Sequence, residues 1–374
     1  MPTYVLDVET YKDFWMVLFK RVGSDETVAF ELFEGQELDV DGLSKMMEDN
    51  LTIGFNSNDY DLFMISGAIN GKSNEELKKI SDKIITGSKP GWMVAGNNDC
   101  EIPRKPYGGT LWNHIDIISV APGQASLKIY GGRINAPKMQ DLPIDPSASI
   151  SPAQREELRT YCLNDLETTE LLYKTLSKQL KLRRDMSKQY KMDLRSKSDA
   201  QIAEAVFRKE IGQLDGRQVL PPKRINRTKR YRYLDPKIIE FRSTELQQTL
   251  KHIIETEFTL TEKASIQLPK WLSEKKIEIG TSKYQMGIGG LHSCEKKRHV
   301  ICDDDHVLRD ADVASYYPSI ILQQGLIPEN IGKGFVDVYT NIYDTRLAAK
   351  ARAGQLVKRL KELEKELAEA RAKV

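Results

Sequence analysis

Short apolar runs rich in β-forming residues open the chain and predict strands. Thr3–Thr10 is the first of them, and the segments Phe14–Arg21 and Glu26–Phe33 follow it as the two arms of a hairpin. Runs of this length and composition are typical of strands rather than helices. We therefore expect a strand and a β-hairpin at the start of the chain.

Two later segments carry the signals of helix starts. Ser151, Pro152 and Gln154 have the spacing of an N-cap, a first-turn proline and a capping box. Ser198–Gln201 repeats the capping pattern before a helix that we expect to run through Glu210. These segments predict a long helix from Pro152 and a second one after it.

The last 28 residues have a helical pattern throughout. In residues 347–374, leucines recur at alternating four- and three-residue steps among many Lys–Glu pairs, at Leu356, Leu360, Leu363 and Leu367. This spacing predicts an amphipathic helix.

Acidic side chains on the predicted elements share faces. Asp7 and Glu9 are two residues apart on the first strand, so both carboxylates project from one side of it, as ligands of a shared divalent cation do. The alternative is an edge strand with a solvated face, which can have the same Asp-x-Glu sequence. Tyr161 and Asp165 are four residues apart on the predicted helix and share a face, although any helix contains such pairs by chance.

Two further clusters combine acids with aromatic residues. Asn56, Tyr60 and Asp61 follow the apolar residues 51–53, where an ordinary Asx-rich loop is the alternative. Asp312 precedes Ser315, Tyr316, Tyr317 and Pro318. In that segment an acid at a strand end could hold a metal that acts on nucleotide phosphates, whereas the alternative is a turn cap beside half-buried tyrosines.

In their order and spacing the four clusters resemble the motifs of family B DNA polymerases of the short phage or protein-primed type, over residues 1–345. The first three clusters are similar to the motifs of the family's 3′→5′ proofreading exonuclease. The segment Asp312–Pro318 is similar to its first polymerase motif, except that Tyr316 occupies a position that is apolar in the family.

The resemblance implies a role for each matched residue. Asp7 would bridge two Mg²⁺ or Mn²⁺ ions, Glu9 and Asp165 would hold the ion that activates water, and Asp61 would support the second ion. Tyr161 would orient the attacking water, and Thr10, Asn56 and Tyr60 would hold the 3′ end of single-stranded DNA. The roles implied for the polymerase motif are metal binding by Asp312 and nucleotide binding by Ser315, Tyr316 and Tyr317.

Other segments suggest contacts with a primer-template. Lys128 follows a Ser-Leu pair between the second and third exonuclease motifs, and Gly289 and Gly290 are similar to the family's template-contacting Tyr-x-Gly-Gly segment, although a flexible turn also explains the glycines.

Charge is distributed unevenly along the chain. Residues 1–175 contain 17 Lys and Arg against 27 Asp and Glu, a balance of −10, and residues 178–237 contain 18 against 7, a balance of +11. The basic belt, which we define as residues 223–233, includes Arg227, Lys229 and Arg230 among tyrosines. This composition suits a DNA backbone, with a solvated surface strand as the alternative.

The resemblance implies an α/β fold in four parts. Residues 1–190 would form a three-layer, ribonuclease H-like exonuclease domain, and residues 191–300 a connector and the N-terminal palm region. Residues 301–345 would add a partial α+β palm, with a strand carrying Asp312 and a helix starting near Pro318. Residues 346–374 would be the first fingers helix or a coiled-coil handle for another chain.

The exonuclease set is complete in this sequence and the polymerase set is not. We therefore expect exonuclease activity from the chain, and DNA synthesis from deoxynucleoside triphosphates only with a C-terminal polymerase half as a separate chain or missing segment. The alternative function is a non-catalytic DNA-binding or assembly subunit of a split polymerase.

The amino-acid composition indicates a globular protein with ordinary apolar cores. An apolar content of 40% suffices for ordinary cores, and the four scattered cysteines indicate free thiols rather than a zinc site. We find neither a charged-then-apolar leader nor an apolar run of membrane-spanning length, and expect a cytoplasmic protein without a membrane partner.

Overall fold

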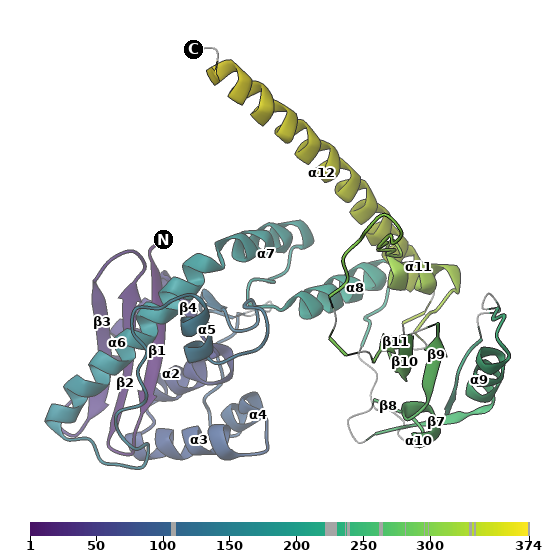
Figure 1. Ribbon diagram of the computed structural model, residues 1–374. Coiled ribbons are helices and arrows are strands. Elements are labelled where there is room, and N and C mark those ends of the chain that lie inside the picture. The colour runs from purple at the N-terminus through teal and green to yellow at the C-terminus, as the bar shows by residue number, and fades with distance from the viewer. Residues whose placement is uncertain are drawn as a thin grey trace. The chain divides into compact units, whose positions relative to one another are not determined.

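The computed structural model describes residues 1–105, 110–220, 230–235, 237, 240–261, 265–280, 282–294, 296–297, 299–328, 331–332 and 334–372. The chain divides into two compact units, Met1–Val206 and Phe207–Val374. Both contain helices and strands (Figure 1), so the α/β class expected from the sequence is confirmed. Among the described residues, no helix is both long and apolar enough to cross a membrane.

A five-stranded mixed sheet forms the centre of the first unit. Its strands are β1 (Thr3–Thr10), β2 (Phe14–Arg21), β3 (Thr27–Phe33), β4 (Leu51–Gly54) and β5 (His114–Asp116), in the spatial order β3-β2-β1-β4-β5. The first three strands pair antiparallel, and β4 and β5 extend the sheet parallel to β1. The predicted strand and hairpin are confirmed, with β3 starting one residue later than expected.

Helices pack on both faces of this sheet. One face is covered by α1 (Val40–Asp49), α2 (Asp61–Ile69), α3 (Asn74–Thr86) and α4 (Gly91–Gly96), and the other by α5 (Leu127–Arg133), α6 (Pro152–Thr175) and α7 (Ser177–Tyr190). Leu6 and Val8 of β1 belong to the first core and Val5 to the second. Because side chains alternate along a strand, Asp7 and Glu9 lie on the face that α6 crosses (Figure 1).

The N-terminus of α6 has the predicted capping box. The Ser151 amide donates to Gln154 Oε1 at 3.0 Å, and the Ser151 hydroxyl accepts from the Gln154 amide at 3.4 Å. Farther along the helix, the buried Glu170 carboxylate accepts from Lys20 Nζ on β2 at 2.5 Å and from the Gly23 amide at 2.7 Å. These two contacts attach α6 to β2 and to the turn that follows it.

The second unit has two small sheets. One contains β9 (Lys276–Ile279), β10 (Ser282–Gly287) and β11 (Gly290–Ser293), and the other β6 (Tyr231–Arg232), β7 (Glu257–Leu260) and β8 (Ile266–Gln267). Its helices are α9 (Thr244–Glu255), α10 (Lys270–Ser273), α11 (Tyr316–Gln323), α12 (Gly334–Ala372) and the end of α8 (Asp199–Asp215). A small core joins α8 to α12 through Ile211, Val219 and Val338.

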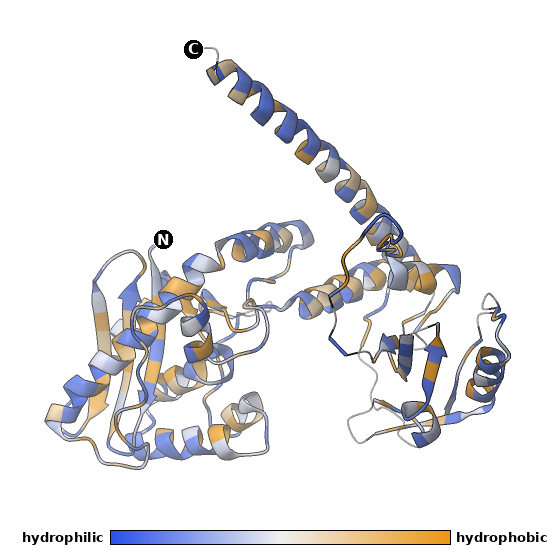
Figure 2. Ribbon diagram, in the orientation of Figure 1, coloured by the Kyte–Doolittle hydropathy of each residue, from blue (hydrophilic) through white to orange (hydrophobic). Residues whose placement is uncertain are grey.

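The helices predicted for the later part of the chain are present. α8 begins at the expected cap and continues five residues beyond Glu210, and α12 contains most of the segment predicted from the leucine spacing. Figure 2 shows that the outer part of α12 is mostly hydrophilic with isolated apolar bands. Leu356 and Leu367 there are 61% and 53% exposed.

The strand predicted around Asp312 is not formed. Residues 301–315 have no helix or strand, and Asp312 is exposed. The backbone bonds of this segment are local, such as the reciprocal pair between Asp303 and His306. A strand needs a neighbour for its amides and carbonyls, and none of the described strands pairs here. The helix expected near Pro318 does form, as α11, and starts at Tyr316.

Candidate functional site

Strands β1 and β4 separate at their carboxyl ends, and the acidic residues gather there. The pairing of β1 with β4 covers only Thr3–Val5. Beyond it the Val8 amide donates to Asp61 Oδ1 at 3.0 Å, where Asp61 is the first residue of α2. A helix start is therefore attached beside Asp7 and Glu9, at the strand ends where α/β sheets commonly bind ligands.

Helix α6 brings its own polar residues to the same place. Cys162 lies under the strand, with its thiol 3.5 Å from Asp7 Oδ2. One residue earlier, Tyr161 lies near enough to Asp165 for its hydroxyl to favour the charged form of that carboxyl, as their four-residue spacing allows. Five predicted site residues from three elements thus converge: Asp7, Glu9, Asp61, Tyr161 and Asp165.

The converging carboxylates raise each other's proton affinity. Burial, followed by the charge of Asp165, raises the pKa of Asp7 to about 7. Burial, followed by the charges of Asp7, Asp165 and Asp61, raises the pKa of Glu9 well above its usual value. The pKa of Asp61 is also well above its ordinary range because of burial and the charge of Asp7. Such mutual perturbation is typical of functional sites.

Few positively charged side chains balance these carboxylates in the described part of the chain. Among the described residues, no Lys or Arg forms an ion pair with Asp7, Glu9, Asp61 or Asp165. Lys128 on α5 is near enough that its charge lowers the pKa of Asp165, although burial outweighs it and the net shift is upward. Its Nζ atom pairs instead with Asp141 at 2.8 Å. Lys128 therefore lies within electrostatic range of Asp165, and its predicted contact with substrate stays a prediction.

The donor set fits a hard divalent cation. Carboxylate oxygens are the ligands that Mg²⁺ and Mn²⁺ prefer, and a cation would offset the repulsion that raises these pKa values. In the side-chain positions of the described residues, no three His, Cys, Asp or Glu side chains close on one common point. The acids share a region, and holding an ion requires side-chain adjustment.

The loop before Asp61 is held by two residues that the sequence analysis did not identify. Asp116, at the end of β5, is 3% exposed and accepts from the amides of Asn56 and Asn58 at 2.9 Å each. The buried His114 ring contacts the hydroxyls of Thr52 and Ser57 at 2.8 and 2.7 Å, and burial lowers its pKa to about 3. Their only sequence signal is a His-x-Asp pattern in an apolar run.

The residues predicted to hold the DNA end lie beside this loop. Asn56 is exposed, whereas Thr10 is 8% exposed and its buried hydroxyl has no hydrogen-bond partner among the described residues. The Tyr60 hydroxyl lies 2.8 Å from Ser81 Oγ. Because that hydroxyl is engaged, the Tyr60 side chain has only its ring left for other contacts.

The remaining predicted residues belong to the second unit. Tyr316 and Tyr317, 53% and 66% exposed, begin α11, and Ser315 before them accepts from Arg346 at 2.9 Å. Gly289 and Gly290 lie at the β10–β11 turn. Arg230 is exposed with its Nε 3.8 Å from Glu257, and the predicted contacts Arg227 and Lys229 lie outside the described residues.

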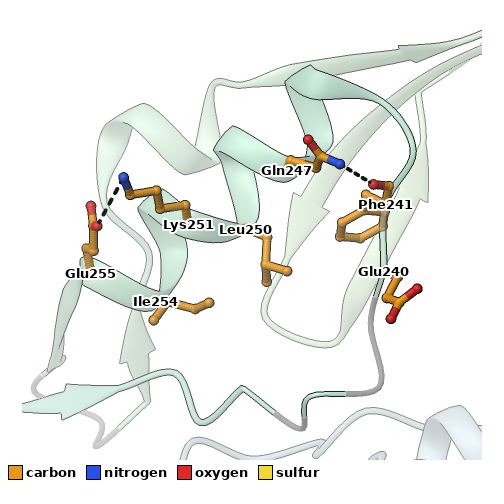
Figure 3. A pocket seen from close by; sticks show the side chains of 7 residues that line it. All are labelled: Glu240, Phe241, Gln247, Leu250, Lys251, Ile254 and Glu255. Atoms are coloured by element: carbon orange, nitrogen blue, oxygen red, sulfur yellow. Dashed lines mark hydrogen bonds and ion pairs between the residues drawn. The ribbon is translucent and has the colours of Figure 1, made fainter.

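A cavity of about 450 Å³ in the second unit contains no comparable chemistry. It lies along α9 between Phe241, Leu250 and Ile254, with Glu240 and Glu255 at its edges (Figure 3). Two of its polar side chains are already engaged: Gln247 donates to the Phe241 carbonyl at 2.6 Å, and Lys251 lies 4.0 Å from Glu255. The carboxylates at the β1–β4 opening are therefore the candidate active site.

Comparison with protein-family models, curated proteins and solved structures found no match for this chain.

Proposed function

We propose that the first unit is a metal-dependent 3′→5′ exonuclease of the ribonuclease H-like type that acts on single-stranded DNA. The observation that carries the proposal is the convergence of four carboxylates and a tyrosine at the open ends of β1 and β4. Their raised pKa values and missing ion-pair partners among the described residues are the electrostatic signs of a cation site. The type of reaction, hydrolysis at the 3′ end of DNA, is inferred from the sequence resemblance.

The acids would hold two divalent cations. Asp7 would contact both, Glu9 and Asp165 one of them, and Asp61 would support the other. When bound, such ions stabilise the attacking and leaving oxygens of an in-line phosphodiester hydrolysis. The product of each cycle is a nucleoside monophosphate released from the 3′ end.

Tyr161 orients the attacking water. Its hydroxyl lies near Asp165, and burial, followed by the charges of Asp165 and Glu9, raises the pKa of Tyr161. The phenol therefore stays protonated at neutral pH and acts as a hydrogen-bonding group, not as a base. A water molecule held by its oxygen would stand next to the carboxylates.

The terminal nucleotide would lie against the loop that precedes α2. Asn56 is exposed there and provides hydrogen-bonding groups, while the ring of Tyr60 provides an apolar surface. Lys128 lies within electrostatic range of Asp165 and can approach a phosphate once it leaves Asp141. Contacts of these kinds recognise a strand end and its backbone, so we expect hydrolysis that is independent of base sequence.

The resemblance extends the proposal to the whole chain as part of a replicative DNA polymerase. In that setting the second unit would contact primer-template DNA, and Asp312 and Tyr317 would act in synthesis only when a polymerase half completes their site.

The direct test is incubation of the full chain with a 5′-labelled single-stranded oligonucleotide, with Mg²⁺ or with EDTA. A nuclease produces a ladder that shortens from the 3′ end only when Mg²⁺ is present. Binding of the oligonucleotide without shortening in Mg²⁺ and in Mn²⁺ would instead support a non-catalytic DNA-binding subunit.

A further inference from the structure

The loop between β4 and α2 has a backbone conformation that needs support. Asn56 has φ 61° and ψ 18°, in the left-handed region, and is followed by a short 3-10 turn at Ser57–Asp59. Asparagine tolerates this region better than most residues but still needs stabilising contacts. The turn leads directly into Asp61, so its conformation decides where Asn56 and Tyr60 stand relative to the acids.

Asp116 provides most of that support. Its Oδ1 accepts from the amides of Asn56 at 2.9 Å and Ile118 at 3.0 Å, and its Oδ2 accepts from the amide of Asn58 at 2.9 Å. One buried carboxylate therefore satisfies three backbone donors on two segments. No Lys or Arg among the described residues pairs with it, so these amides are its main stabilisation.

A second contact fixes the inner side of the turn. The Ser57 hydroxyl lies 2.7 Å from His114 Nε2, directly beside Gly54. A Cβ atom on Gly54 would lie 2.4 Å from Ser57 Oγ and 3.2 Å from His114 Cε1, so only glycine allows this approach. Strand β5 thus contacts the loop through both of its polar residues.

Strand β5 is itself anchored, which makes it a fixed support. The Asp116 amide donates to Ser196 Oγ at 2.9 Å, and Arg195 Nη1 donates to Asn113 Oδ1 at 2.7 Å. The segment after α7 therefore covers the edge of the sheet next to the loop.

We infer that Asp116 is a positioning residue for the DNA end: by holding the Asn56–Tyr60 loop it presents Asn56 and the Tyr60 ring to the 3′-terminal nucleotide. This inference rests on the proposed exonuclease function and adds to it a residue that touches neither substrate nor metal. Its hydrogen bonds act on substrate binding, because the contact of Asp61 with the Val8 amide does not depend on Asp116. Its charge also raises the pKa of Asp61, and this effect is lost equally in every uncharged variant of Asp116.

The test is a graded series of variants in the full chain, assayed for kcat and KM on a single-stranded oligonucleotide in Mg²⁺. Asp116→Asn retains one carbonyl oxygen and places an amide group against a backbone N–H, whereas Asp116→Ala removes every acceptor. We expect KM to rise about threefold for Asp116→Asn and about tenfold or more for Asp116→Ala, with kcat per folded molecule nearly unchanged. Ser57→Ala serves as an independent second variant if Asp116→Ala does not fold.

Glu170→Gln is the matched control, since Glu170 is also a buried carboxylate that accepts a backbone amide, from Gly23, and pairs with lysines away from the loop. It should lose stability and keep the parental KM. Amide hydrogen exchange without DNA gives a readout that does not depend on activity: exchange at Asn56 and Asn58 should accelerate in both Asp116 variants and stay parental in Glu170→Gln.

An active parent with unchanged KM in Asp116→Asn and Ser57→Ala would overturn the inference and leave the exonuclease intact. A parent that degrades no DNA would overturn both.

Discussion

The carboxylate of Asp61 accepts a hydrogen bond from the amide of Val8, 53 residues earlier in the chain, at 3.0 Å. This bond attaches the start of α2 to the strand that carries Asp7 and Glu9, at the point where β4 no longer pairs with that strand. Asp61 therefore has two separable properties, a backbone contact and a negative charge.

Two substitutions at Asp61 should separate these properties. Asp61→Asn retains a carbonyl oxygen for the Val8 amide, so its unfolding free energy should be at least that of the parent, whereas Asp61→Ala should lose about 1–3 kcal/mol. Both should lose at least about tenfold in exonuclease rate because both remove the charge. Urea unfolding in EDTA and initial rates in Mg²⁺ measure the two effects. Equal stability of the two variants would refute the structural role of the bond.

Tyr161→Phe should reduce the rate less than removal of an acid does. The ring stays, while the hydroxyl that favours the charged form of Asp165 is lost. We expect kcat to fall by about ten- to a hundredfold, at the low end of the usual contribution of a proton-handling or water-positioning group, with little change in KM.

The control for this variant is Tyr173→Phe, which alters a partly buried tyrosine on the same helix, away from the acids. It should keep the parental rate. A Tyr161→Phe enzyme as active as the parent would remove the water-orienting role.

Replacing Asp7 should stabilise the protein when no divalent ion is present. The pKa of Asp7 is raised to about 7 in the folded protein by burial and by Asp165, from an ordinary value of 3.8. The folded state therefore holds this proton more tightly than the unfolded state, and the group's contribution to stability falls as pH rises from about 4 to about 7. Asp7→Asn should be more stable than the parent by roughly 1–3 kcal/mol at pH 8 in EDTA.

Two comparisons check the electrostatic origin of that gain. At pH 4 the advantage of Asp7→Asn should nearly vanish, because the parent is then protonated at Asp7 as well. Addition of Mg²⁺ at pH 8 should raise the melting temperature of the parent more than that of the variant. A stability difference independent of pH would contradict the assignment.

We expect the native carboxylate of Glu257 to weaken DNA binding by the second unit, because it pairs with two arginines that could otherwise contact phosphates. Its carboxylate, on β7, pairs with Arg232 of the adjoining strand β6 at 2.8 Å and lies 3.8 Å from Nε of Arg230, which directly precedes β6. Glu257→Gln releases both guanidinium groups, so the slope of log K against log salt for primer-template binding should steepen by up to about two units. Glu278→Gln, which releases only Lys283 on the other sheet, is a charge-matched control. An unchanged slope for Glu257→Gln would place Arg230 and Arg232 away from the DNA.

The sequence predicted those elements whose signals are local. The capping box at Ser151 and Gln154 lies within four residues of chain, and the structure confirms both of its hydrogen bonds. The two-residue spacing of Asp7 and Glu9 likewise predicted that they share a face, because the alternation of side chains along a strand is a local property.

Features that depend on distant partners were missed or wrong. Asp116 acquires its role from amides about 60 residues away, and the only local sign of it in the sequence is the His-x-Asp pattern with His114. The ion pair of Lys20 with Glu170 joins residues 150 positions apart. The strand expected at Asp312 fails for the same reason, since no described strand pairs with that segment.

The central claim is that the carboxylates of Asp7 and Glu9 hold the ions that cleave DNA, and a double variant tests it most directly. Asp7→Ala with Glu9→Ala is compared with the parent and with Glu75→Ala plus Asp185→Ala, which removes two exposed acids outside the cluster. Release of nucleoside monophosphate from the 3′ end of single-stranded DNA is measured in Mg²⁺. We predict a loss of at least about a hundredfold in the first double variant, since both ions lose ligands, and parental activity in the second. Parental release by the Asp7 and Glu9 double variant would contradict the account.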